Sequence, residues 1–274
     1  MKIFQQLRMC ILPMPTTYAH HRFGAEMLEF MPGDIRGTAQ RYRRLFHVGL
    51  HGPDPLFFYR PVFSGKIHRL GRKFHMQTGR EFFSRACRSL RMEPDEGGCA
   101  YLYGVLCHFV LDACCHPLLR RAEKDGAAGH MRIERSFDRF LMEADGIRIP
   151  GGMPIATGLK LNSQECELVS SFYPGTDRRI ILESVQTMAL VERILEMPPG
   201  PARNAVTQTV SALSGTFRDM LAGQKPDPAC APWENALLEK YRQAAELFPD
   251  MLLRLIAHLN YNAPLGDRFD PVFG

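Results

Sequence analysis

The stretch Tyr101-Leu-Tyr-Gly-Val-Leu-Cys-His-Phe-Val-Leu-Asp-Ala-Cys-Cys-His-Pro117 decides the fold of this 274-residue chain. Apolar side chains occupy nearly every position, so a helix formed here has no polar face and belongs in a protein interior. His108 and Asp112 are four residues apart, about one helical turn, so their side chains point the same way. Burying an unpaired carboxylate costs free energy, so Asp112 requires a cation or several hydrogen-bond donors. The sequence therefore predicts a core helix that carries a charged site.

His116 lies one further turn along and directly precedes Pro117. Steric contact with a proline ring shifts the preceding residue away from helical geometry. We therefore expect a bend at His116, so that its imidazole need not share the face of His108 and Asp112.

A second imidazole–carboxylate pair, His130 and Glu134, follows on the next amphipathic segment. Imidazole and carboxylate are normal zinc ligands, and three protein groups per ion leave a position for an activated water. Two such ions also clamp a phosphate group. One pair alone is more often a structural hydrogen bond. Two pairs on successive helices, with His116 between them, leave the metal site and the structural role both open.

Helical periodicity extends along almost the whole chain, whereas alternating strand patterns are scarce. The periodic segments are 21–30, 77–90, 99–115, 130–143, 179–196, 202–221 and 233–259. Proline-rich breaks at 198–201 and 225–228 separate the last three segments. These patterns predict an all-α fold, with residues 14–274 as one domain.

Residues that bind metals or transfer protons are concentrated in the first half of the chain. Of the ten histidines, only His258 lies beyond Pro150. We therefore expect the chemistry before residue 135, and we expect the later helices to complete the bundle.

Composition and charge are those of an ordinary soluble protein. The chain is 45% hydrophobic and 23% charged, and its net charge of +5 is small. Its arginine pairs are dispersed, at 43–44, 120–121 and 178–179. Nucleic acid is disfavoured as a partner, because it requires basic residues clustered on one face. Weak attraction to an anionic surface is compatible with this charge.

Neither the N-terminus nor the cysteines indicate secretion. Residues 1–13 form a leader whose short apolar stretch ends at Pro13 without a good cleavage site, and Met14 is an alternative start. No run approaches the roughly 18 apolar residues that a membrane span needs. Eight irregularly spaced cysteines without a Cys-x-x-Cys pair predict buried thiols in a reducing compartment. We therefore expect a cytoplasmic protein, with peripheral contact to the membrane left open.

Five pieces of sequence carry a resemblance to a known family. They are Thr16-Thr-Tyr-Ala-His-His-Arg-Phe-Gly24, His51-Gly-Pro-Asp-Pro-Leu-Phe-Phe-Tyr59, Gly71-Arg-Lys-Phe-His-Met-Gln-Thr-Gly-Arg-Glu-Phe-Phe83, residues 101–117 and His130-Met-Arg-Ile-Glu134. In order and spacing they resemble the zinc-dependent phospholipase C family over residues 14–145. The resemblance implies an all-α bundle of the phospholipase C and nuclease type that holds up to three zinc ions. It also implies a phospholipid substrate, or another phosphodiester, that is hydrolysed at its headgroup.

The same resemblance assigns site residues one by one. It places one zinc ion at His75, His108 and Asp112, and a second at His116, His130 and Glu134. A third ion would use His20, with Asp112 as a bridge. Asp54 is assigned as the general base or as a further metal ligand.

Two of these assignments have a competing neighbour. His68 competes with His75, and His21 competes with His20. Adjacent helical residues point about 100° apart, so only one of His20 and His21 faces the cluster. We prefer His75 and His20 because they keep the register of the family's motifs.

The chain departs from secreted members of the family in two places. Those members bind a zinc ion through an N-terminal tryptophan, whereas the only tryptophan here is Trp233. Two zinc ions are therefore expected, and the third is left open. The short spacing between Asp112 and His116 leaves the substrate headgroup open as well.

Two alternative functions are compatible with the same residues. A nuclease or other phosphodiesterase would use the same ligand chemistry, and a non-catalytic zinc-stabilised helical protein would bind lipid or protein without hydrolysis. Structural zinc sites are usually closed by four protein ligands. The aromatic run 56–59 favours ordinary core over a contact with acyl chains. The sequence indicates no oligomeric state.

Overall fold

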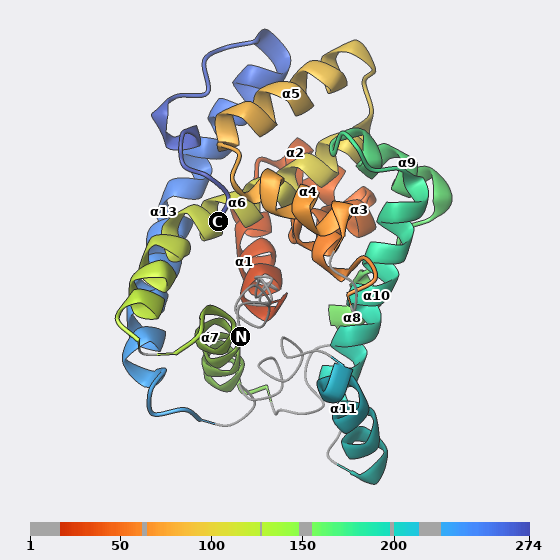
Figure 1. Cartoon of the computed structure of the whole chain (residues 1–274). Coiled ribbons are helices and arrows are strands. Elements are labelled where there is room, and N and C mark those ends of the chain that lie inside the picture. Colours follow the sequence, from red (N-terminus) through yellow and green to blue (C-terminus); the bar gives the residue numbers. More distant parts are fainter. Residues whose placement is uncertain (1–16, 62–64, 127, 148–154, 198–199, 214–225) are drawn as a thin grey trace, which may run out of the picture.

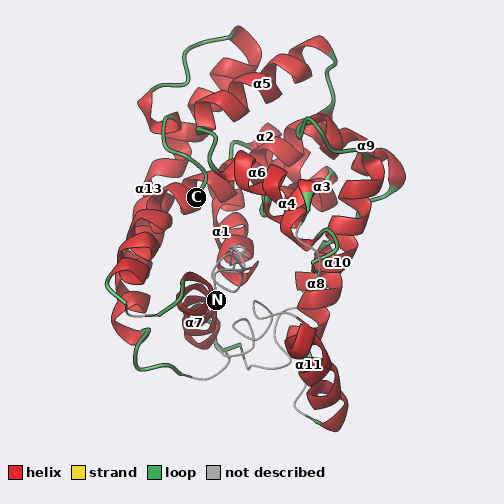
Figure 2. Cartoon of the chain, viewed as in Figure 1, coloured by secondary structure: helices red, strands yellow, loops and turns green. Residues whose placement is uncertain are grey.

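Helices make up the regular structure of this protein. The structure, a computed structural model, describes residues 17–61, 65–126, 128–147, 155–197, 200–213 and 226–274. Across these ranges the chain forms α-helices, short 3₁₀ helices and two isolated bridges, with no strand (Figure 2). The predicted all-α fold is confirmed.

The helices of the first half of the chain supply the predicted site residues. They are α1 (Thr17–Phe30), α2 (Gly33–Arg41), α3 (Arg43–Gly49), the 3₁₀ helix η1 (Asp54–Phe58), α4 (Lys66–His75), α5 (Gly79–Met92), α6 (Glu96–Lys124) and α7 (His130–Ala144). The second half contributes α8 (Ile155–Gly158), α9 (Ser163–Ser171), α10 (Arg178–Glu196), α11 (Pro201–Leu213), α13 (Ala231–Tyr261) and the 3₁₀ helix η2 (Asp267–Phe269).

Each predicted helical segment falls on one of these helices. The segments correspond to α1, α5, α6, α7, α10, α11 and α13. The shorter helices were not predicted, because fewer than three turns show little periodicity. The leader at 1–13 and the end of the predicted segment 202–221 lie outside the described residues.

The 29-residue helix α6 is the centre of the bundle (Figure 1). The Asp95 side chain caps its start by accepting a hydrogen bond from Gly98 N at 2.7 Å. Helices α1, α2, α3, α7 and α13 pack around it.

By length and composition α6 is sufficient to cross a membrane, which corrects the expectation that no run comes close. However, 78% of its apolar window is buried inside the protein, as in the core helix of a soluble protein.

Helix α6 continues through Pro117 to Lys124, so the predicted bend at His116 is wrong. A proline inside a helix removes one backbone hydrogen bond and disfavours, without forbidding, a helical residue before it. Leu119 and Ala122, beyond the proline, are buried. Continuing the helix keeps these two side chains in the core, which offsets the lost hydrogen bond. His116 therefore stays on the face of His108 and Asp112.

Two glycines bring α3 into close contact with α6. A Cβ atom on Gly49 would lie 2.3 Å from the backbone oxygen of Tyr101, and one on Gly104 would lie 2.3 Å from that of Phe46. Only glycine permits this approach of the two backbones. The turn that follows α3, residues 51–54, is thereby held against the middle of α6.

The aromatic run after this turn is core, as predicted. Leu56, Phe57 and Phe58 are all buried, and η1, which they form, packs against α4 and α10. Their burial anchors Asp54, the first residue of η1, at a defined position in the interior.

Helix α7 holds the start of α1. The Asp138 carboxylate accepts hydrogen bonds from Tyr18 N at 3.3 Å and Ala19 N at 2.8 Å. Both amides belong to the first turn of α1, which has no partner within the helix for them. Asp145 adds bonds from the Tyr18 hydroxyl at 2.6 Å and from Arg22 at 2.7 Å. These contacts fix the position of His20 relative to α7.

The last residues return to the centre of the molecule, as Figure 1 shows. Helix α13 ends at Tyr261, and the next residue, Asn262, has a left-handed φ of 55°. The segment beyond it passes α5 and α6, where Gly79 N donates to Pro271 O at 2.9 Å and Gly274 N donates to His75 O at 3.2 Å. Phe273 is buried against the rings of Phe109 and His108. The end of the segment thus lies beside predicted site residues.

Candidate metal centre

Asp112 lies at the centre of the predicted site, among three imidazoles. Its Oδ2 is 3.2 Å from His108 Nε2 and 3.4 Å from His116 Nε2. Its Oδ1 is 3.2 Å from His20 Nε2, which comes from α1. His108, Asp112 and His116 share one face of α6 because they are spaced four residues apart. The carboxylate therefore faces several imidazoles at once, an arrangement suited to a bridging ligand.

Asp54 and His75 complete the deep part of the site. Asp54 Oδ1 lies 2.7 Å from His75 Nε2, and Oδ2 lies 3.7 Å from His108 Nδ1. The other ring nitrogen of His75 is 2.9 Å from the carbonyl oxygen of Gly71, so it carries the proton. The neutral tautomer would then turn a lone pair toward the Asp54 carboxylate. A positive charge on or between the two groups, either a proton or a metal ion, is needed to make this contact favourable.

A second set of side chains lies farther out, between α6 and α7. Glu134 Oε1 is 3.1 Å from His130 Nε2 and 3.9 Å from His116 Nε2. The two imidazole centroids are 5.0 Å apart. His130 and Glu134 are four residues apart on α7, so the helix itself aligns them.

The structure brings all eight predicted residues together. The residues form three sets, and within each set the ligand atoms lie within 4.8 Å of one another. The sets are His20, Asp54 and His108; His75, His108 and Asp112; and His116, His130 and Glu134. The last two are the sets predicted for two zinc ions. The first differs from the prediction, which grouped His20 with Asp112. We call His20, Asp54, His75, His108 and Asp112 the inner group, and His116, His130 and Glu134 the outer group.

Several ligand atoms of the site are buried and lack a hydrogen-bond partner among the described residues. They are His20 Nδ1, Asp54 Oδ2, His108 Nδ1, His108 Nε2 and Glu134 Oε2. The 3.2 Å contact of His108 Nε2 with Asp112 is therefore not aligned as a hydrogen bond. An unsatisfied buried polar atom costs about 1–3 kcal/mol. Nitrogen and oxygen donors left unpaired around three carboxylates fit a zinc ion in both charge and ligand type.

Burial and the neighbouring carboxylates shift the pKa values of the imidazoles in opposite directions. Burial lowers the pKa of His108 to about 4, in spite of Asp112 and Asp54. Burial also disfavours the charge on His20, but Asp112, Asp54 and Glu134 outweigh it and raise the pKa of His20 to about 9. Neutral imidazole is the form that binds metal. His108 therefore offers a lone pair at pH 7, whereas a metal at His20 has to displace a proton.

Comparison with known proteins places this cluster in a family. A family model described as zinc dependent phospholipase C matches residues 19–172, more than half of the chain. The chain belongs to the zinc-dependent phospholipase C family. It is therefore a hydrolase, and its family implies zinc and a phospholipid substrate. The matched range contains every residue of the inner and outer groups. No curated protein and no solved structure matches the chain.

The structure separates both pairs of competing histidines. His75 contacts Asp54, whereas His68 Nδ1 accepts a hydrogen bond from Gly65 N at 3.1 Å at the start of α4. His20 belongs to the inner group, whereas the ring of His21 faces His47 at 5.3 Å. The preferred residue of each pair thus lies in the candidate metal site, and its competitor lies outside.

The sequence analysis did not predict two residues that lie at the site. His51 is buried, its Nδ1 has no partner in the described chain, and its ring lies 6.5 Å from His20. Gly52 has a φ of +47°, and a Cβ there would lie 2.4 Å from His108 Cδ2. Both residues stand in the piece His51–Tyr59 that carried the resemblance, from which only Asp54 was assigned to the site.

A pocket of about 350 Å³ opens at the outer group. Its lining includes His75, His116 and His130, together with Met76, Arg120 and Val272. This volume is in the range of small-molecule sites. The pocket therefore reaches ligands of both the inner and the outer group.

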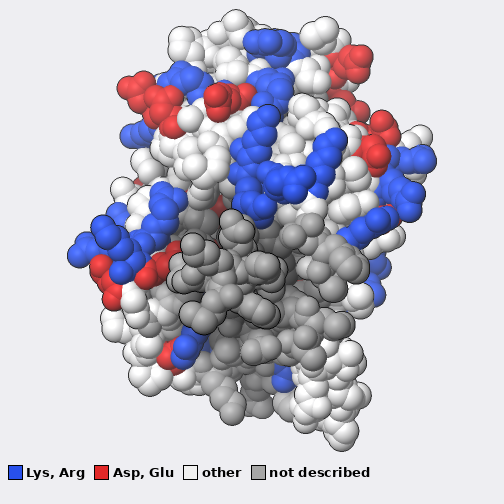
Figure 3. Space-filling view, viewed as in Figure 1, with Lys and Arg blue, Asp and Glu red and all other residues white. Residues whose placement is uncertain are grey.

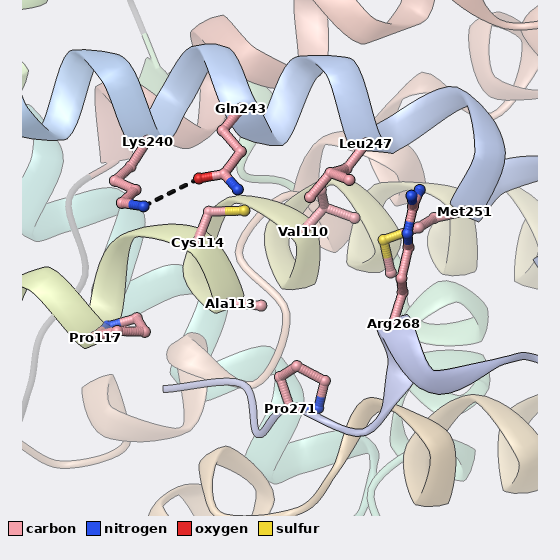
Figure 4. Close-up of a pocket in the computed structure, with 10 residues that line it drawn as sticks. All are labelled: Val110, Ala113, Cys114, Pro117, Lys240, Gln243, Leu247, Met251, Arg268 and Pro271. Carbon is pink, nitrogen blue, oxygen red and sulfur yellow. Dashed lines mark hydrogen bonds between the residues drawn. The ribbon is translucent and has the colours of Figure 1, made fainter.

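A separate groove of about 290 Å³ lies between α6 and α13 (Figure 4). Val110, Leu247 and Met251 are among its apolar walls, and Lys240 is hydrogen-bonded to Gln243 at 3.0 Å at one end. No His, Asp or Glu lines it among the described residues. The groove therefore has no group suited to the hydrolytic chemistry of the family.

Proposed function

We propose that this chain hydrolyses the phosphodiester bond between the diacylglycerol and the headgroup of a phospholipid. The observation that carries the proposal is the convergence of five elements, α1, η1, α4, α6 and α7, on buried ligand atoms that lack partners. Phospholipid hydrolysis is the chemistry that the family implies for such a site.

In this proposal two zinc ions are held by the sets that coincide with the predicted ones. These sets are His75, His108 and Asp112, and His116, His130 and Glu134. The third set, with His20 and Asp54, is the candidate for an additional ion. Zinc supplies Lewis acidity toward phosphoryl oxygens and lowers the pKa of water toward ~7.

Asp54 is the proposed general base. His75 occupies its Oδ1, while its Oδ2 is buried without a hydrogen-bond partner. The free oxygen is therefore available to accept the proton of the attacking water, and the contact with His75 keeps the carboxylate from rotating. A base has to lie within hydrogen-bond reach of the proton that it accepts, and the position of Asp54 between His75 and His108 places its carboxylate among the inner-group ligands.

The rim of the pocket is proposed to position the rest of the lipid. Arg120 is exposed there and is suited to a lipid phosphate, because a guanidinium donates to two phosphate oxygens at once. Met76 and Val272 offer apolar contacts to the glycerol and acyl parts. The location remains the cytoplasm in this proposal, which the free thiols of all described cysteines support.

The test is release of phosphorylated headgroup from monomeric short-chain phosphatidylcholine, together with the zinc content of the purified protein. Chelation is expected to abolish release, and added zinc to restore it. The chain offers matched variants: His20→Asn and His75→Asn should lose zinc and activity, whereas His21→Asn and His68→Asn should keep both.

Two results would contradict the proposal. Hydrolysis of oligonucleotides without hydrolysis of phospholipid would indicate the nuclease alternative. Stoichiometric zinc without hydrolysis of any phosphodiester would indicate the non-catalytic zinc-stabilised protein.

A further inference from the structure

Helix α4 is a basic amphipathic helix. Its buried side consists of Ile67, His68, Gly71, Phe74 and His75. Its other side carries Lys66, Arg69, Arg72 and Lys73, which we call the α4 basic face. At 100° per residue these four cations fall within about a third of the helix circumference. The helix contains no Asp or Glu to offset them.

The α4 basic face has no acidic partner among the residues that the structure describes. None of its four side chains forms an ion pair or a side-chain hydrogen bond with any residue that the structure describes, and Arg72 Nη1 is buried without a partner. Basic residues nearby are different: Arg60 pairs with Glu183 at 3.3 Å and Arg80 pairs with Asp270. In Figure 3 the Lys and Arg side chains gather over α4 without acidic side chains among them. Within the described part of the chain, no side chain therefore neutralises the positive charge of this face.

The α4 basic face is next to the mouth of the site. Helix α4 ends at His75, which lines the pocket, and the next residue, Met76, also lines it and has 69% of its surface exposed. Ten helical residues extend about 15 Å, so the cations are within that distance of the mouth along the helix axis. Helices that lie on a membrane surface combine Lys and Arg with apolar side chains that enter the headgroup layer, and Met76 is an exposed apolar side chain next to these cations.

We propose that the α4 basic face docks the protein on an anionic phospholipid surface, with Met76 at the headgroup layer and the pocket mouth toward the membrane. The inference rests on the proposed function, because docking serves to deliver a membrane lipid to the site. Each basic residue near an anionic leaflet strengthens partitioning about fivefold. Single-stranded nucleic acid fits less well, because such sites combine cations with exposed aromatic rings for base stacking, and α4 exposes none.

The experiment measures sedimentation of the full chain with two kinds of vesicle, phosphatidylcholine alone and phosphatidylcholine with about 25% phosphatidylglycerol. The variant Lys66→Gln/Arg69→Gln/Lys73→Gln removes three charges from the α4 basic face. The control Arg43→Gln/Lys160→Gln/Arg193→Gln removes three exposed charges from α3, the α8–α9 connection and α10. A third variant, Lys66→Arg/Arg69→Lys/Lys73→Arg, keeps the charge.

Four results are expected. The chain binds anionic vesicles more tightly than neutral ones, and salt weakens this preference. The α4 variant loses about a hundredfold in partitioning to anionic vesicles. The control and the charge-keeping variant stay within a fewfold of the wild type. All variants hydrolyse monomeric short-chain lipid at the wild-type rate.

Equal binding of the α4 variant and the control would overturn the inference, as would equal binding of the wild type to both vesicle types. So would a loss of oligonucleotide binding in the α4 variant with vesicle binding intact. If the proposed function were wrong but the docking inference right, vesicle binding would still depend on α4, and no lipid would be hydrolysed in any assay.

Discussion

The inner and outer groups are built in different ways from similar residues. The outer group comes from two consecutive helices, and its His130–Glu134 pair is aligned by one helical turn. The inner group comes from α1, η1, α4 and α6, and its members His20 and Asp112 are 92 positions apart, the difference between their residue numbers. His108 is fully buried, whereas the side chain of His130 is 13% exposed at the mouth. The comparison teaches that the outer group needs one helical turn of α7 and one contact with the preceding helix, whereas the inner group needs four elements packed together.

Removing one histidine from each group should give the largest effects and break the comparison most directly. His108→Ala should lose more activity than the 10–100-fold typical of removing a side chain that only hydrogen-bonds a metal ligand. It should also destabilise the fold by about 2–4 kcal/mol, because it empties a fully buried position. His130→Ala should lose comparable activity, but less than about 1 kcal/mol of stability. Turnover, zinc content and thermal unfolding are the measurements. Equal destabilisation by the two variants would remove the distinction between the groups.

The Gly52→Ala variant tests whether the inner group depends on close packing. A methyl group there meets His108 at 2.4 Å on a backbone with positive φ. Displacing a catalytic group by about 1 Å costs about a hundredfold in rate, which is the expected loss of turnover. Gly146→Ala is the matched control, because Gly146 also has a positive φ of 71° but no atom within 4 Å of the added Cβ. It should cost only about 1–2 kcal/mol of backbone strain and no activity. Wild-type turnover in Gly52→Ala would show that the inner group tolerates displacement.

Glu192 makes the stability of the fold depend on pH. Burial raises the pKa of Glu192 to about 7, and the side chain contacts Thr17 at the start of α1. Because the pKa is raised in the folded state, the protonated carboxyl of Glu192 contributes fully to the stability of the fold below about pH 4.5. This contribution, up to about 3 kcal/mol, is lost as the pH rises through about 7. Glu192→Gln should therefore be more stable than the wild type at pH 8, and the difference should shrink toward pH 5. Thermal unfolding of both proteins between these pH values measures it; parallel curves would refute the raised pKa.

Asp138 should give the smallest effect, and it connects the two groups. It caps the start of α1 from α7, the helix of the outer group. Asp138→Ala should cost about 1–2 kcal/mol, the range for losing a helix cap, and weaken zinc binding at His20 more than at Glu134. Asp145→Ala is the control: its bonds to Tyr18 and Arg22 are more exposed, so its loss should cost less than about 1 kcal/mol. Unfolding free energies and zinc titrations measure both. Equal costs for the two variants would place Asp138 among ordinary surface contacts.

The sequence by itself determined the parts of this protein that depend on local geometry. Long helices were predictable because apolar periodicity persists over many turns, as in α10 and α13. The alignment of His108 with Asp112, and of His130 with Glu134, follows from the helical repeat alone. Resemblance to the family added His20, Asp54 and His75, which no local pattern singles out.

Only the tertiary structure decided which faces turn inward. His116 stays in line with Asp112 because buried residues beyond Pro117 keep α6 continuous, an effect invisible in the local proline rule. His51 lies at the site because the close contact of Gly49 with α6 holds the turn 51–54 in the protein interior. Packing between elements distant in sequence sets these positions, and a period along one helix carries no information about its neighbours.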